Sequence, residues 1–340
     1  MHNPDSSSKP IRIGITHGDF NGVSYEIILK TFSDSRMLQM LTPVLYGQSK
    51  VLSYYKKSLG IDDFNYSLTR DVRQLWPQKF NVVNITDDDL KIEPGMATEQ
   101  AGKMAALSLK RAADDLMRGN LDALVTAPLN PSVLKSEAFP YNGQSDYLSS
   151  LFNEGQDYVE MLVSDYLRIG MVTSDIAVKD AIAVISKEMV MHKLVILAKS
   201  LKKDFNIATP KIAVLSLNPH AGDAGLAGME ERDVITPVLS VAQKNGLFAF
   251  GPFAADRLFG TGAWKKYDAV LAMYHDQAAL PFKMLSVNGG VIFTAGLPVV
   301  RTSPFHGPAY DIANKNEASP DAMRQAMFLA LDILNNQRLI

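Results

Sequence analysis

The stretch TEQAGKMAALSLKRAADDLMRGNLDALVTAP, residues 98–128, joins a helix pattern directly to a strand pattern. In its first part, small or apolar residues recur at the helical repeat between lysines and arginines: Ala101, Ala105, Ala112 and Leu116. The run at 121–128 is short and apolar, as buried strands are. The stretch therefore predicts an amphipathic helix over 98–119 that packs one face on a sheet to which the next strand belongs.

Similar apolar runs recur along the rest of the chain, at 11–16, 42–47, 167–174, 211–217 and 268–273. Amphipathic segments separate these runs, and strands that alternate with helices form mostly parallel sheets with helices on their faces. The sequence therefore predicts an α/β fold.

The chain length indicates more than one usual domain. At 340 residues we expect one long or two closely joined α/β domains. The loop-rich stretch that begins at residue 128 leads from the first domain into the second, and a C-terminal helix returns to the first. The expected first domain comprises residues 10–130 and 308–340, the second comprises 131–307, and residues 1–9 form a flexible tail.

Composition excludes several classes of protein. Lysine and arginine number 34 against 36 acidic residues, a net charge of -2, so no global basic field favours nucleic acid or a membrane surface. The chain has no cysteine, which excludes disulfides and thiolate ligands, so any metal must bind His, Asp or Glu. No secretory h-region and no membrane-spanning apolar run is apparent, and we expect a cytoplasmic protein that acts on small molecules.

Ligands of open α/β sheets bind beyond the carboxyl ends of strands. After the run at 11–16, THGDFNGVSYE at residues 16–26 has Gly18 and Gly22 before a helix that starts near Val23. This pattern is typical of an anion site at a helix N-terminus. It is equally typical of an ordinary strand-to-helix turn.

The segment SLNPHAGDAGLAGMEE, residues 216–231, interleaves Asn218, His220 and Asp223 with glycines. Glycines at this density let the backbone approach a ligand closely. The order matches neither a Rossmann fingerprint nor a P-loop, so neither motif is inferred. The density of polar residues favours a functional loop over a structural one.

Two further segments have histidine or basic side chains near the ends of predicted strands. In LAMYHDQAALPFK, residues 271–283, His275 follows an apolar run as His220 does, and two such imidazoles can share a divalent ion, although a lone histidine is more often a core residue. In GLPVVRTSPFHG, residues 296–307, Arg301 suits a planar grip on phosphate or carboxylate, with Lys283 as a second cation. A surface salt bridge is the alternative role for Arg301.

Together, GITHGDFNG, DALVTAPLN, SLNPHAGDAGLAGMEE, DAVLAMYHDQAALPFK and TAGLPVVRTSPFHGPAYDIA resemble the PdxA family, the 4-hydroxythreonine-4-phosphate dehydrogenases of pyridoxal phosphate (vitamin B6) biosynthesis. The resemblance implies two α/β/α domains, similar to isocitrate and isopropylmalate dehydrogenases, with the active site in the interdomain cleft at a homodimer interface. It also implies a reaction in which NAD oxidises 4-phosphooxy-L-threonine. The β-keto acid then loses carbon dioxide to give an aminoketone phosphate, with a divalent metal at the reacting oxygen.

The resemblance carries site roles onto particular residues. His220 and His275 match two of the three metal ligands of the family. Lys283 and Arg301 match substrate-binding positions, and Lys283 is also placed with the catalytic residues. The catalytic acids are expected to be Asp256 and Asp276, which match acidic residues near the metal and suit proton transfer or ligand orientation.

Three positions depart from the family pattern. The third metal histidine, in a stretch that reads T-T-H-I-P in the family, is Asp175 here, which favours harder ions such as Mg²⁺ or Mn²⁺. The family sequence G-H-T-E reads GQSD here, so Gln144 and Ser145 are the expected substrate contacts. Ile292 replaces an asparagine of the substrate site and cannot form a hydrogen bond, which costs an unsatisfied partner about 1 to 3 kcal/mol.

These departures leave three functions open. The first is the family reaction; the second is oxidation of a related four-carbon phosphorylated sugar acid; the third is an inactive paralogue that binds a phosphometabolite. The retained histidines and basic residues favour an enzyme, because mere binding does not require a metal site. A phosphorylated hydroxy acid is the expected substrate, and a homodimer is the expected assembly.

The cofactor contacts have the weakest sequence signal. The resemblance implies NAD, with NADP left open, and a divalent ion among Zn²⁺, Mg²⁺, Mn²⁺ and Co²⁺. Asn218, Gly222 and Asn314 are the predicted cofactor contacts. The segment DIANKNEASPD, residues 311–321, departs from the glycine-rich form of the family and does not decide between NAD and NADP.

Overall fold

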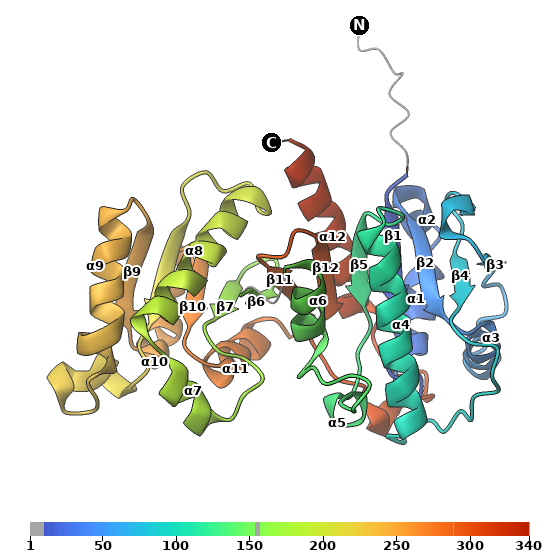
Figure 1. The fold of residues 1–340 in the computed structure, drawn as a ribbon, viewed down its shortest axis with the longest axis horizontal. Helices are drawn as coiled ribbons and strands as arrows, with labels where there is room; N and C mark the ends of the chain where they lie inside the picture. Colours follow the sequence, from blue (N-terminus) through green and yellow to red (C-terminus); the bar gives the residue numbers. More distant parts are fainter. Residues whose placement is uncertain (1–9, 154–156, 288, 340) are drawn as a thin grey trace, which may run out of the picture. The chain divides into compact units, whose positions relative to one another are not determined.

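The computed structural model describes three stretches of the chain, residues 10–153, 157–287 and 289–339. The chain divides into two compact units (Figure 1). The first comprises Met1–Pro140 and Val299–Leu331, and the second comprises Tyr141–Pro298 and Asp332–Ile340. The predicted tail at residues 1–9 lies outside the described residues.

The first unit contains a parallel sheet. Its strands are β1 (Arg12–Thr16), β2 (Thr42–Gly47), β3 (Ser67–Leu68), β4 (Asn81–Asn84), β5 (Ala123–Thr126) and β12 (Val300–Pro304). They lie in the order β3-β4-β2-β1-β5-β12, and each described pair is parallel. The carboxyl ends of β1, β5 and β12 therefore lie at one edge of this sheet.

Helices cover this sheet. They are α1 (Ser24–Phe32), α2 (Arg36–Met40), α3 (Ser49–Ser58), α4 (Glu99–Met117), α5 (Pro131–Leu134), the short η1 (Val72–Gln74) and η5 (Tyr310–Ile312), and α12 (Asp321–Arg338), which continues into the second unit. Helix α4 confirms the predicted amphipathic helix. Thr98 caps it by accepting a hydrogen bond from the Ala101 N–H at 3.2 Å, and its buried face contacts β1, β2 and β5 (Figure 1).

The second unit contains a mixed sheet. Its strands are β6 (Val159–Val163), β7 (Arg168–Met171), β8 (Lys211–Leu215), β9 (Phe248–Phe253), β10 (Ala269–Ala272) and β11 (Val291–Ala295). They lie in the order β11-β6-β7-β10-β8-β9, in which β6 is antiparallel to both neighbours and the other pairs are parallel. The prediction of an α/β fold with mostly parallel sheets is confirmed.

The second unit also contains helices and short helical segments that connect its strands. They are α6 (Gln144–Phe152), α7 (Val178–Val184), α8 (Lys187–Lys203), α9 (Thr236–Lys244), α10 (Ala255–Gly260) and α11 (His275–Leu285), with the short segments η2 (Pro219–Gly225), η3 (Glu231–Ile235) and η4 (Ala263–Lys266). Across the described residues, no helix is both long and apolar enough to cross a lipid bilayer.

Candidate active site

The loop after β8 is anchored by a buried carboxylate. Glu231 Oε1 accepts hydrogen bonds from the backbone N–H groups of Leu217 at 2.8 Å and Asn218 at 2.7 Å. Its Oε2 accepts a third from Asn218 Nδ2 at 3.0 Å. Glu231 is only 5% exposed, so these charge-assisted bonds form away from water and fix the start of the loop.

The same loop then makes a left-handed turn that presents His220. Consecutive residues have positive φ: His220 (53°), Ala221 (54°), Gly222 (80°), Asp223 (43°) and Ala224 (53°). Glycine is favoured at position 222, because φ is 80° and a Cβ would lie 2.6 Å from Glu231 Oε2, so the anchoring carboxylate would have to move. His220 is exposed at the turn, and backbone strain of this kind collects at functional sites.

A second group of predicted residues meets at the carboxyl ends of β7 and β10. Asp175, His275 and Asp276 line one hollow of about 250 Å³, together with Thr173 and Tyr274. His275 begins α11, and its Nδ1 lies 3.7 Å from Asp276 Oδ1. The structure thus brings together two of the predicted metal ligands and one predicted catalytic acid.

Gln277 ties this hollow to the His220 loop. Its Oε1 accepts a hydrogen bond from the Met273 N–H at 2.9 Å, and its Nε2 donates to the Ser216 carbonyl at 2.7 Å. Met273 follows β10 directly, and Ser216 follows β8 directly. One amide therefore holds the two histidine-bearing loops in register.

The three predicted metal ligands do not all line the same hollow of this chain. His220 does not line the hollow of Asp175 and His275, and the residues that the structure describes contain no group of three or more His, Asp or Glu placed for a metal. The donors of the hollow, carboxylate oxygens and an imidazole nitrogen, fit Mn²⁺, Mg²⁺ or Zn²⁺ in type. A complete coordination sphere requires additional donors.

The predicted substrate contacts of the second unit gather on one face of the β6–β11 pair. Thr294 pairs with Glu160, and Ile292 pairs with Leu162, so Ile292, Thr294 and Glu160 share a face by the two-residue period. Ser145, on α6, donates from Oγ to Glu160 Oε1, and its Oγ lies 3.3 Å from Thr294 Oγ1. Ser145 therefore contacts the face of the strand pair to which Ile292 belongs.

Glu160 adds a carboxylate to this face, and Gln144 precedes Ser145 at the start of α6. The buried Oε1 of Gln144 has no hydrogen-bond partner among the described residues. Glu160 was missed by the sequence analysis, although a carboxylate at an alternating position of the apolar run VEMLV was a usable signal. This face thus carries the carboxylate of Glu160 and the hydroxyls of Ser145 and Thr294, which lie within hydrogen-bonding distance of one another through Ser145.

In the first unit, Arg301 is buried within β12. It is 3% exposed, and its Nε and Nη2 both donate to Thr126 Oγ1, at 3.0 and 2.7 Å. Thr126 ends β5, so the guanidinium lies at the edge of the sheet where ligands of such folds bind. Arg301 is thus a strand residue, whereas the sequence had suggested a position after the strand.

A polar network at the same edge was not predicted. The Tyr310 hydroxyl donates to Asp19 Oδ2 at 2.6 Å, and Asn130 Nδ2 donates to the Tyr310 oxygen at 3.3 Å. These residues follow β12, β1 and β5. Burial raises the pKa of Asp19, and the hydrogen bond from Tyr310 opposes that shift. The network fixes three strand-end loops of the first unit to one another.

The remaining predicted residues are exposed or already engaged. Asp256 is exposed on α10, just after β9. Lys283 is exposed on α11, seven residues after Asp276 and so on the same helical face. Asn314 has a φ of 60°, and its Oδ1 accepts a hydrogen bond from Ser58 Oγ at 2.6 Å.

The fold and these strand-end donors are typical of an α/β enzyme that binds its ligands at the carboxyl ends of strands. The family model described as pyridoxal phosphate biosynthetic protein PdxA matches residues 39–330. The chain therefore belongs to the PdxA family, and the predicted family and enzyme class are confirmed.

Individual relatives agree with this assignment. A 4-hydroxythreonine-4-phosphate dehydrogenase of Bacteroides thetaiotaomicron is 45% identical over 328 residues, 96% of this chain and 90% of the relative. A protein of Oceanobacillus iheyensis named putative D-threonate 4-phosphate dehydrogenase is 36% identical over 331 residues, 96% of this chain and 98% of the relative.

Solved structures also resemble this chain. The crystal structure of 4-hydroxythreonine-4-phosphate dehydrogenase from Klebsiella pneumoniae has a TM-score of 0.80 and 29% identity, and the match covers 97% of this chain and 99% of that one. Isocitrate dehydrogenase from Methylococcus capsulatus has a TM-score of 0.51 and 12% identity, with 96% and 88% coverage, which shows a shared fold alone.

Proposed function

We propose that the chain oxidises and decarboxylates 4-phosphooxy-L-threonine with NAD and a divalent metal. The relative from B. thetaiotaomicron supports this reaction by its name. The structural observation that carries the proposal is the hollow in which Asp175, His275 and Asp276 meet at the carboxyl ends of two parallel strands.

The proposed reaction gives each predicted site residue a catalytic or binding role. Asp175, His220 and His275 would hold the metal, which when bound polarises the alcohol and stabilises enolate charge. Asp276, on the rim of the hollow, accepts or orients the proton of the alcohol, and Asp256 is the second candidate acid. Arg301 and Lys283 bind the anionic groups of the substrate.

The cofactor is assigned to the strand-end loops. NAD accepts the hydride, and NADP is the alternative. Asn218 and Gly222 lie in the strained loop fixed by Glu231, where the missing side chain of Gly222 brings backbone close to a ligand. Asn314 is the third proposed contact, and cofactor binding there has to displace or share its bond with Ser58.

Glu160 favours an amino acid as the substrate. 4-Phosphooxy-L-threonine carries an ammonium group where threonate 4-phosphate carries a hydroxyl. A carboxylate near Ser145 and Thr294 can form an ion pair with the ammonium, whereas a hydroxyl can donate a hydrogen bond to it but cannot form an ion pair. The likeness to the O. iheyensis protein makes oxidation of the four-carbon sugar acid phosphate the second candidate.

The decisive assay is NAD reduction with each substrate, in parallel with Zn²⁺, Mg²⁺, Mn²⁺ or Co²⁺ and with a chelator. We expect metal-dependent turnover of 4-phosphooxy-L-threonine. The Glu160→Gln substitution should lower kcat/KM for this substrate about tenfold and for the threonate ester much less, because only the first loses an ion pair. Glu188→Gln, at an exposed glutamate on α8, is the matched control.

Other outcomes assign another function. Turnover of the threonate ester alone supports the second candidate. A folded protein that reduces no NAD with any metal, but binds the phosphorylated substrate, is the inactive binding paralogue.

We also propose a homodimer that completes the metal site. Large apolar side chains are exposed on α11 and just after it, including Leu280 (63%), Met284 (77%) and Val287 (80%), and Ile182 on α7 is 47% exposed. Both helices begin beside the hollow of Asp175 and His275. Large apolar side chains exposed beside a site suggest a protein interface, and a second copy can supply the donors that one chain lacks.

The molecular mass in solution and the affinity for Mn²⁺, measured on the same variants, test the proposed dimer. We expect the doubly substituted Leu280→Asp, Met284→Asp protein to be a monomer with weakened Mn²⁺ binding, because charges desolvated at the interface are costly. Tyr166→Asp, at another exposed apolar residue of the same unit (77%), is the control. A wild-type monomer that binds metal fully would contradict the proposal.

A further inference from the structure

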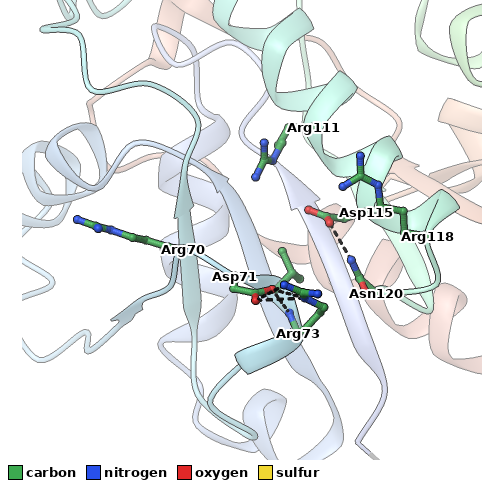
Figure 2. A pocket seen from close by; sticks show the side chains of 8 residues that line it. Arg70, Asp71, Arg73, Arg111, Asp115, Arg118 and Asn120 are labelled. Carbon is green, nitrogen blue, oxygen red and sulfur yellow. Dashed lines mark hydrogen bonds and ion pairs between the residues drawn. The ribbon is translucent and has the colours of Figure 1, made fainter.

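An arginine-lined hollow lies in the first unit, and its lining includes none of the residues proposed for catalysis or for substrate, cofactor or metal binding. Its volume is about 540 Å³. We call it the arginine pocket, and its lining consists of Arg70, Asp71, Val72, Arg73, Arg111, Asp115, Arg118 and Asn120 (Figure 2).

The pocket lies at the amino end of the sheet. Arg111 and Arg118 are on α4 and its C-cap, and Asn120 follows just before β5 begins. Arg111 and Arg118 are seven residues apart and so share a face of the helix. Arg73 faces them from η1 (Figure 2). Strand-end ligands such as those expected near Arg301 bind at the opposite edge of this sheet.

The carboxylates of the pocket are already engaged. Asp71 accepts three hydrogen bonds from the Arg73 guanidinium, at 2.9, 3.1 and 2.8 Å. Asp115 is only 6% exposed and accepts from the Tyr46 hydroxyl at 2.9 Å and from Asn120 Nδ2 at 3.0 Å. Burial and the neighbouring Asp115 raise the pKa of Tyr46, so its hydroxyl remains a donor to that carboxylate.

This arrangement leaves cationic groups without acidic partners. Asp115 lies four residues after Arg111 and three before Arg118, spacings at which a helix usually forms ion pairs. Within the described part of the chain, Arg70, Arg111 and Arg118 nevertheless form no ion pair or side-chain hydrogen bond. The lining contains four guanidinium groups and two carboxylates, so it has a net charge of +2.

We propose that the arginine pocket binds a small anion that carries two phosphoryl groups, the class represented by pyrophosphate. Arg111 and Arg118 project from a rigid helix, and guanidinium groups bind phosphate oxygens in a bidentate manner. The volume falls within the range of small-molecule sites. Nucleic acid is a poorer fit, because the basic residues line a hollow in a chain whose net charge is -2. The proposal is independent of the proposed dehydrogenase activity.

Calorimetric titration of the full-length protein with pyrophosphate tests this site. The titration is run at roughly 0.15 M salt, where screening acts beyond about 8 Å. We expect saturable binding that Arg111→Gln and Arg118→Gln each weaken about tenfold or more, since each removes a charge-assisted pair of bonds. Arg111→Lys should weaken it less, because it retains the charge.

Arg36→Gln is the matched control. Arg36 is also an exposed arginine of the first unit, but it is paired with Asp34 at 2.6 Å. Its loss changes the net charge equally and should change pyrophosphate affinity less than about twofold. Thermal unfolding of each variant verifies that it is folded.

Four outcomes overturn the proposal. The first is no saturable binding of pyrophosphate by wild type. The second is an equal loss in Arg36→Gln, which indicates general charge attraction. The third is stronger binding of a single-stranded oligonucleotide that depends on the same arginines, which indicates a nucleic-acid site instead. Orthophosphate binding as tight as pyrophosphate would restrict the site to one phosphoryl group and also contradict it.

Discussion

The buried His17 makes the stability of the first unit sensitive to acid. It is 1% exposed and lies against the rings of Phe20 and Tyr25, at centroid distances of 6.1 and 5.8 Å. Its Nε2 lies 3.2 Å from the Met104 carbonyl oxygen, while its Nδ1 is buried without a hydrogen-bond partner among the described residues. Burial lowers the pKa of His17 from 6.5 to about 4, against the smaller opposing effect of the Met104 bond.

The size and sign of the effect follow from this pKa. The folded pKa is below the unfolded one, so the unfolded chain binds the proton more tightly. The contribution of His17 to stability is present in full above pH 6.5 and is lost as the pH falls from 6.5 towards 4. At about 1.4 kcal/mol per pKa unit, the loss is roughly 3 kcal/mol, a large part of a usual folding free energy of about 5–15 kcal/mol.

Urea unfolding at pH 7 and pH 4 measures this loss. Other groups titrate over the same range, so the informative quantity is the difference between wild type and His17→Gln, which keeps a polar side chain but does not titrate. We expect the variant to lose roughly 3 kcal/mol less than wild type on acidification. His192→Gln, at an exposed histidine of α8, should lose as much as wild type. Equal acid losses in wild type and His17→Gln would refute the reasoning.

The remaining predictions concern the metal ligands, the His220 loop and Arg301. Asp175→His should raise the affinity for Zn²⁺ relative to Mg²⁺, because imidazole suits softer ions, and metal titration showing no change in preference would count against its role as a ligand. Glu231→Ala should destabilise the fold by about 2–4 kcal/mol in denaturant unfolding, since two backbone N–H groups lose a charged acceptor, and a loss below about 1 kcal/mol would contradict this. Arg301→Lys should lower kcat/KM about tenfold or more, because lysine cannot keep two N–H groups on Thr126 while binding substrate; near-normal kinetics would remove Arg301 from the site.

The hydrophobic pattern of the sequence predicted the strands and helices whose buried residues recur with the period of that element. The run at 42–47 coincides with β2, which is buried at every position, and the helix at 98–119 contains α4. Strands β6 and β11 were not predicted. Polar residues such as Glu160 and Thr294 interrupt their apolar pattern, and these residues face each other only after antiparallel pairing.

The donors of the candidate site could be predicted, but the groups that position them could not. The motifs predict His220, His275 and Asp175 as metal ligands; Asp175 and His275 line one hollow, and the metal role of all three stays a prediction. Gln277 acts through the Ser216 carbonyl, 61 residues away in sequence, and Tyr310 bonds to Asp19 across 291 residues. Such partners are determined by the order of the strands, which a single sequence does not reveal.

The energetics of the His220 loop explain why its anchor is a buried carboxylate. His220, Ala221, Asp223 and Ala224 have positive φ without being glycine, and a left-handed turn costs roughly 1–2 kcal/mol for each such residue. Three hydrogen bonds to Glu231, at roughly 1.5–3 kcal/mol each for a charged partner, are of the same total size. A neutral acceptor would supply about half as much and leave the turn unfavourable. The loop is therefore held near energetic balance, so a ligand that binds His220 or the nearby backbone can stabilise one loop conformation with only modest binding energy.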